Sequence, residues 1–147
     1  MQTGIVLPHH EIGTDTGAIR AFVTGAEELG AAHIMIYDHV VGADRNRPGG
    51  FEGPYDKDVQ FHEPFTFFSY IAALTNKVEL VTGIVILPQR QTALVAKQAA
   101  ELAILSENRL RLGIGTGWNA VEYEVLNEDF TNRGRRQEEQ VELLRRF

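Results

Sequence analysis

Apolar residues gather along the chain in four short runs, at residues 5–7, 34–37, 78–87 and 110–114. The runs are nearly continuous and rich in β-branched side chains, and they do not alternate with polar residues. This pattern is typical of strands that other elements cover on both faces. It predicts four buried strands.

A segment with the helical spacing of apolar residues follows each predicted strand. The apolar face of the first segment consists of Ala18, Phe22, Ala26 and Leu29. Potential caps at residues 14–16 and Gly30 bound this helix. Pro64 suits the first turn of the second helix. Residues 92–106 form an alanine-rich third helix, and a fourth begins near residues 131–132 and continues to the end of the chain.

The predicted order βαβαβαβα implies an α/β fold with a parallel sheet and right-handed crossovers. An open doubly wound sheet and a segment of a (β/α)8 barrel both satisfy this order, and periodicity does not choose between them. The last helix runs through Leu144 to Phe147 without a glycine, a proline or a polar tail. Because helices usually carry a stop signal, we expect a truncated or subdivided chain.

The composition narrows the classes of partner. A net charge of -6 disfavours binding to a phosphate backbone, so no nucleic-acid partner is expected. The absence of cysteine excludes disulfides, thiolate metal sites and cysteine nucleophiles. No apolar run approaches the ~20 residues that span a bilayer, and the start lacks the pattern of a secretory signal. We therefore expect a cytoplasmic protein with no membrane partner.

The unusual residues of the chain lie directly after the predicted strands, where parallel α/β folds hold their ligands. In chain order they are Pro8, His9 and His10, then Asp38 and His39, then residues 88–91, and finally residues 115–119. The long segment 42–62 has neither helical nor strand periodicity. Such a segment is usually a lid or a binding loop, and the alternative is a disordered insertion.

Several of these features allow a second interpretation. His9 and His10 are adjacent, so in an extended segment they would point to opposite sides, and we expect no metal site. The glycine run 113–118 resembles a dinucleotide fingerprint, but Trp118 occupies the place of the last glycine and the run follows the fourth strand. Its glycines are better explained by close approach of the backbone to a flat ligand. The pair Asp38-His39, taken alone, fits a surface turn.

Five segments together resemble the luciferase-like monooxygenases and their deazaflavin-using relatives. They are YDHV at residues 37–40, LVTGIVILPQR at 80–90, LVAKQAA at 94–100, RLGIGTGWN at 111–119, and the Arg-Gly and Glu-Glu pairs of residues 133–139. The resemblance covers the whole chain and implies a TIM barrel. Because a complete barrel has eight βα units and about 250 residues, residues 1–147 would form its amino-terminal half, with four βα units.

The resemblance also implies redox chemistry on a flavin-type cofactor. Coenzyme F420, a deazaflavin that transfers hydride, is the expected cofactor, and FMN is the alternative. We expect His39, oriented by Asp38, to donate or accept a proton beside the cofactor. The pair Gly83-Ile84 matches a non-prolyl cis peptide of the deazaflavin relatives. The remaining cofactor-binding residues would be Thr116, Gly117, Trp118 and Asn119. The sugar-phosphate dehydrogenase branch has an acidic residue where Trp118 stands, so a sugar-phosphate substrate is not expected.

Three functions stay open from the sequence. The first is half of an F420-dependent oxidoreductase acting on a small organic substrate, which we do not expect to be active alone. The second is half of an FMN-dependent monooxygenase. The third is a non-catalytic half-barrel that self-associates through its exposed edge strands into a homo-oligomer. An independent flavodoxin-like domain would require helices on both faces of the sheet.

Overall fold

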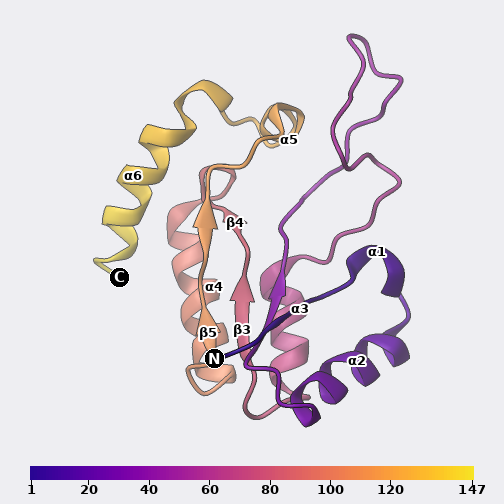
Figure 1. Ribbon diagram of the computed structural model, residues 1–147. Helices are drawn as coiled ribbons and strands as arrows, with labels where there is room; N and C mark the ends of the chain where they lie inside the picture. The colour runs from indigo at the N-terminus through magenta and orange to yellow at the C-terminus, as the bar shows by residue number, and fades with distance from the viewer.

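The computed structural model describes all 147 residues, and strands alternate with helices along the chain (Figure 1). The strands are β1 (Ile5–Val6), β2 (His33–Ile36), β3 (Glu79–Thr82), β4 (Val85–Ile86), β5 (Leu110–Arg111) and β6 (Ile114–Gly115). The α-helices are α1 (His9–Ile12), α2 (Thr16–Glu28), α3 (Pro64–Ala72), α4 (Thr92–Leu105), α5 (Ala120–Val125) and α6 (Arg133–Leu144). Two 3-10 turns, η1 (Leu87–Gln89) and η2 (Phe130–Asn132), precede α4 and α6.

The main sheet has four parallel strands in the order β1-β2-β3-β5. Strand order therefore follows chain order without the reversal that defines a doubly wound sheet. Sequential parallel strands with helical crossovers are the arrangement of a barrel segment. The structure confirms the predicted half of a (β/α)8 barrel, and β1 and β5 each pair with a single neighbouring strand.

The third and fourth apolar runs were each expected to form one strand, and this was wrong. Each divides into two strands, and β4 pairs with β6 in a separate two-stranded sheet. The first division lies at the peptide bond between Gly83 and Ile84, which is cis, as predicted. At the second, the carbonyl of Gly113 accepts hydrogen bonds from Thr82 Oγ1 at 2.7 Å and from Val85 N at 2.8 Å. A Cβ at Gly113 would collide with the Thr82 carbonyl oxygen, so only glycine allows this approach.

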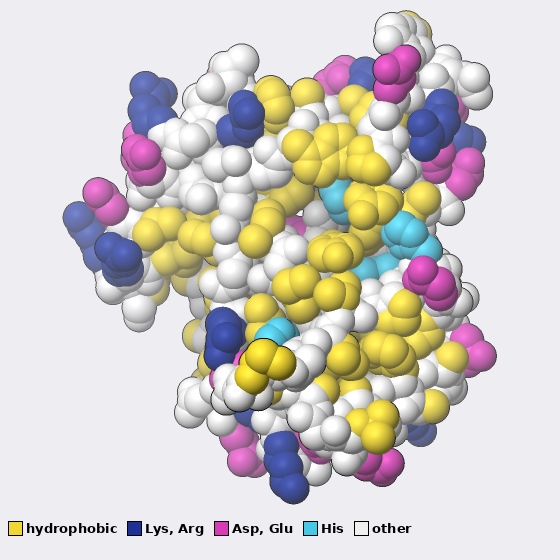
Figure 2. Space-filling model, viewed as in Figure 1, with side chains coloured by type: hydrophobic (Ala, Val, Ile, Leu, Met, Phe, Trp, Pro, Cys, Tyr) yellow, Lys and Arg dark blue, Asp and Glu magenta, His cyan; other side chains and the backbone are white.

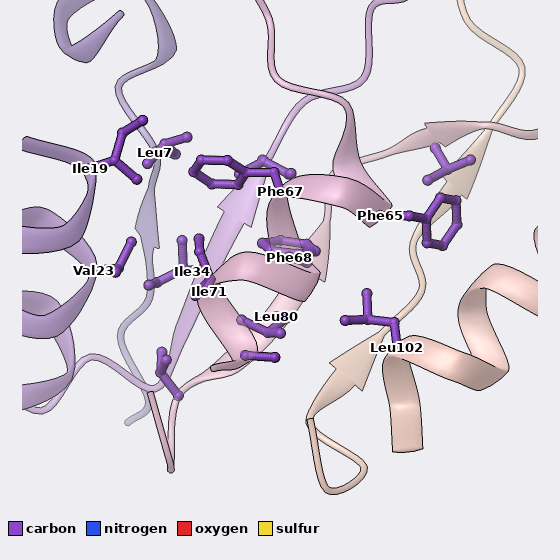
Figure 3. Packing of buried hydrophobic residues seen from close by; sticks show 14 of the residues in the cluster. Leu7, Ile19, Val23, Ile34, Phe65, Phe67, Phe68, Ile71, Leu80 and Leu102 are labelled. Atoms are coloured by element: carbon purple, nitrogen blue, oxygen red, sulfur yellow. The ribbon is translucent and has the colours of Figure 1, made fainter. Parts of the chain in front are cut away.

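Helices cover one face of the main sheet. Ile34, Ile36 and Leu80 face the helices and are fully buried, whereas the intervening residues of β2 and β3 are only partly buried. The expectation that both faces are covered was therefore wrong. Figure 3 shows Ile19 and Val23 of α2 beside Leu7 and Ile34. Phe68 and Ile71 of α3 belong to the same buried cluster. In Figure 1, α3 and α4 lie behind the strands.

The predicted helices are present, with small differences at their ends. Asp15 caps α2 by accepting hydrogen bonds from two backbone amides, and Glu63 caps α3. Gly30 follows α2 with a φ of 82°, as expected of a C′ glycine. Leu29 was predicted on the buried face but is 91% exposed. The short helices α1 and α5 were not predicted. None of the helices has the length and apolar character needed to span a membrane.

Candidate functional site

A cavity of about 270 Å³ opens where β2, β4 and β6 end. Its lining consists of Tyr37, Asp38, His39, Tyr55, Gly83, Ile84, Ile86, Gly115, Thr116, Gly117 and Trp118. Seven of the eight predicted site residues are in this lining, and Asn119 is not. The structure thus brings together residues that lie in three separate loops of the sequence.

Two glycines of the lining make room for isoleucine side chains. A Cβ on Gly115 would lie 2.9 Å from Ile84 Cδ1, and one on Gly117 would lie 2.8 Å from Ile86 Cγ2. Gly117 also has a φ of 67°, which strains any other residue. The absence of side chains at these positions lets Ile84 and Ile86 pack closely against the backbone, and both supply apolar surface to the cavity.

His39 is held by a residue that the sequence analysis missed. Its Nδ1 atom lies 3.2 Å from both carboxylate oxygens of Glu122, and Oε1 of Glu122 also accepts a hydrogen bond of 3.0 Å from Val40 N. Glu122 belongs to α5 and is fully buried. A signal was present, because Asn119-x-x-Glu122 has the spacing of a capping box and marks a helix start. That spacing does not reveal the contact with His39.

Asp38 does not orient His39, contrary to expectation. Its Oδ2 atom accepts a hydrogen bond from Ile86 N at 2.9 Å, and its Oδ1 atom accepts one from Arg90 at 2.9 Å. Arg90 also donates to Glu63 at 3.1 Å. Burial alone would lower the pKa of Arg90, but the Asp38 and Glu63 carboxylates outweigh it and raise the pKa above its ordinary value. Asp38 therefore fastens the end of β2 to the chain at β4 and η1.

Aromatic side chains form the outer wall of the cavity. Trp118 is 44% exposed, and it stacks on Phe51 with ring centroids 6.3 Å apart. The ring of Tyr55 lies 5.3 Å from that of His39. Phe51 and Tyr55 both come from segment 42–62, which contains no helix or strand, as predicted, and only one isolated bridge, between Ala43 and Asp56. This loop projects beyond the strand ends in Figure 1 and contributes directly to the site.

Two hydrogen bonds, from Val121 N to Asn119 and from Tyr123 to Thr116, hold the turn between β6 and α5. Asn119 is buried, and its Oδ1 atom accepts a hydrogen bond from Val121 N at 3.1 Å as the cap of α5. The hydroxyl of Tyr123 donates to the Thr116 carbonyl at 2.6 Å. Burial raises the pKa of Tyr123 to about 12, so the phenol keeps its proton. These bonds hold Thr116 and its neighbours in place at the rim of the cavity.

A histidine-rich cluster joins the long loop to the body of the protein. His9 and His10 lie on helix α1. The expectation that they lie in an extended segment was therefore wrong. His9 is 3% exposed, and its ring lies 5.3 Å from Phe61 and 5.9 Å from His62. Its Nε2 atom accepts a hydrogen bond of 3.3 Å from Tyr37 N. Figure 2 shows histidine side chains gathered among hydrophobic ones on this face.

The chain belongs to the luciferase-like monooxygenase family, whose sequence model matches residues 1–147. An uncharacterized protein of Mycobacterium tuberculosis is 39% identical over 85 residues, which are 58% of this chain and 30% of that protein. The aligned stretches cover 22–30% of the length of the curated relatives that the chain matches.

Solved structures of this fold superpose on nearly the whole chain. One is the oxygenating constituent of 3,6-diketocamphane monooxygenase from Pseudomonas putida in complex with FMN, with a TM-score of 0.75 and 18% identity over 98% of this chain and 38% of that one. Another is an F420-dependent secondary alcohol dehydrogenase in complex with an F420-acetone adduct, with a TM-score of 0.73 and 22% identity over 99% of this chain and 42% of that one. At these identities they establish the fold alone.

We predict that acid destabilises the fold through His9. Burial above all, and then the neighbouring His62, His10 and His39, lower the pKa of His9 from 6.5 to about 4. Below pH 6.5 the unfolded chain binds a proton that the folded chain refuses, so this stability is complete above pH 6.5 and is lost as the pH falls toward 4. The full loss is on the order of 3 kcal/mol.

Urea unfolding at several pH values measures this loss. A His9→Gln variant should flatten the dependence between pH 6.5 and 4, whereas the control variant His33→Gln should keep it. An unchanged slope in His9→Gln would show that His9 is not the responsible group.

Proposed function

We propose that the cavity at the carboxyl ends of the strands receives the flat ring of coenzyme F420, and that residues 1–147 are the amino-terminal half of an oxidoreductase acting on a small organic substrate. The observation that carries this proposal is the glycine-lined side of the cavity. Added Cβ atoms on Gly115 and Gly117 would collide with Ile84 and Ile86, which line the same cavity as Trp118. A flat apolar ring fits such a surface.

The residues of the proposed site have different roles. Gly83, Ile84, Thr116, Gly117 and Trp118 contact the ring, while Asn119 contributes indirectly by capping α5. A bound deazaflavin supplies hydride transfer.

The two residues predicted as catalytic have different tasks. His39 holds or releases a proton at the substrate. Asp38 acts as a positioning residue, because both its carboxylate oxygens are engaged by Ile86 and Arg90.

FMN is the second candidate cofactor, and monooxygenation is the chemistry that it would supply. The similar fold of an FMN-bound monooxygenase supports it. The ring pocket alone does not choose between the two cofactors, because both have a flat tricyclic ring. In barrels of this type, phosphate groups frequently bind at the loops after strands seven and eight. The chain has four βα units, so we expect it to bind either cofactor weakly.

Trp118 provides a direct test of cofactor binding, because it is the only tryptophan of the chain and lines the cavity. We predict that F420 and FMN quench its fluorescence to saturation, beyond their effect on free tryptophan. Gly117→Ala should weaken binding at least about tenfold, or 1.4 kcal/mol, because its new Cβ would collide with Ile86 in the cavity lining. Gly134→Ala, where nothing lies within 4 Å of the added Cβ, is the matched control. Quenching that matches free tryptophan would refute the proposal.

In a complete barrel that carries this chain as its first half, we predict that His39→Ala lowers turnover about 10²- to 10⁴-fold, the usual contribution of acid–base catalysis. The thermal midpoint should also fall, because the variant removes one of the two groups that donate hydrogen bonds to the buried Glu122 carboxylate, but the loss of turnover should exceed what this loss of stability explains. Steady-state kinetics and thermal unfolding of the same variant separate the two effects. Turnover within about threefold of the unmutated enzyme would remove His39 from the reaction.

We also propose that the chain self-associates, with a second copy completing the barrel. Strands β1 and β5 each leave one edge unpaired. Beside β1 and α2 lies a hydrophobic groove of about 510 Å³ that includes Ile5, Phe22 and Leu29. An unpaired strand edge next to exposed apolar surface favours association.

Light scattering at micromolar concentration should give twice the chain mass of 16.4 kDa. Leu29→Lys should shift the chain toward monomer, because it places a charge in the groove. Ile104→Lys is the control, since Ile104 is 71% exposed on α4 and outside the groove. A cooperatively folded monomer that binds no hydrophobic dye would rule out self-association.

A further inference from the structure

Glu122 is a buried acid without a lysine or arginine partner. Its exposed fraction is 0%, and the only basic side chain within 4 Å of its carboxylate is His39. Burying a carboxylate costs several kcal/mol unless hydrogen bonds compensate it. The compensation here consists of Val40 N at 3.0 Å and His39 Nδ1 at 3.2 Å. Both of these hydrogen bonds come from the two residues that follow Asp38 in the chain.

This arrangement determines which nitrogen of His39 carries the proton. An ionised carboxylate only accepts hydrogen bonds, so Nδ1 must be the donor. In the neutral ring the lone pair is then on Nε2. That atom has no hydrogen-bond partner in the protein and is not among the buried atoms without partners, so it is open to the cavity that His39 lines.

The rings around His39 favour one orientation of the imidazole. Phe61 lies 4.6 Å from it, Tyr55 5.3 Å and Trp118 5.8 Å, measured between ring centroids. A flip of the ring would also exchange Nδ1 for a carbon beside the Glu122 carboxylate and lose the hydrogen bond. Orientation and tautomer therefore depend on the same contact.

We propose that Glu122 is a positioning residue that holds His39 in the Nδ1–H tautomer, so that Nε2 is the atom that takes a proton from the substrate. This deepens the proposed function and rests on it for the substrate. In the step, the bond between the substrate and its proton breaks and leaves its electron pair on the substrate, an Nε2–H bond forms with the lone pair of Nε2, and the positive charge on the ring faces the Glu122 carboxylate. In the reverse direction Nε2 returns the proton. Glu122 itself exchanges no proton.

The tautomer can be measured on this chain without any cofactor. The chain has five histidines, and ¹⁵N-histidine NMR at alkaline pH distinguishes protonated from unprotonated ring nitrogens. A His39→Gln variant assigns the His39 signals by their loss. We expect Nδ1 of His39 to be protonated and Nε2 unprotonated. An Nε2–H tautomer in the unmutated chain would overturn the proposal, and this result needs no folded Glu122 variant.

Glu122→Gln tests the cause. If the amide oxygen keeps its bond to Val40 N, its NH₂ group donates to Nδ1, and the proton must move to Nε2. Glu124→Gln is the matched control, because the Glu124 side chain is 69% exposed on the same helix. The tautomer should reverse in the first variant and persist in the second. A folded Glu122→Gln chain with an unchanged tautomer would overturn the proposal, whereas failed cofactor binding with the expected tautomer would refute only the cofactor site.

Discussion

The site depends on the buried carboxylate of Asp38, which joins two strand ends that are far apart in the sequence. By accepting hydrogen bonds from Ile86 N and from Arg90, it connects the end of β2 to β4 and η1. Arg90 extends the connection to Glu63 at the start of α3. With Asp38 fixed in this way, the neighbouring His39 is presented to the cavity. Removal of one partner from such a network leaves an uncompensated buried charge, which is strongly destabilising.

A second buried acid completes the arrangement from the opposite side. Glu122 reaches His39 and Val40 from α5, and the position of α5 depends in turn on the turn held by Asn119 and by Tyr123. The two acids have separate tasks: one fixes the backbone at the strand ends, and the other fixes an imidazole. The fold brings both to the same edge because parallel strands in sequential order place all their carboxyl ends together.

Buried β-branched runs and helical periodicity are local signals, so they were sufficient to predict the strands and the main helices. They were not sufficient for the strand order, and the barrel arrangement was predicted from the resemblance. Most of the cavity lining could be predicted because it directly follows the strands. The cis peptide at Gly83, where the first strand divides, was predicted from the resemblance. The break at Gly113 was not predicted, because it depends on the tertiary contact with Thr82. Asp38 was assigned to the wrong partner because adjacency in the chain does not tell which way a side chain points. Glu122 was missed because it lies 83 positions from His39, and its local pattern indicates only a helix start.

A crystal structure of the chain grown at saturating F420, and separately at saturating FMN, tests the central claim most directly. We predict density for the tricyclic ring within the cavity that His39, Ile84, Gly115 and Trp118 line. Density for the ring in the groove beside α2, or nowhere on the chain at concentrations that saturate the fluorescence change of Trp118, would contradict it.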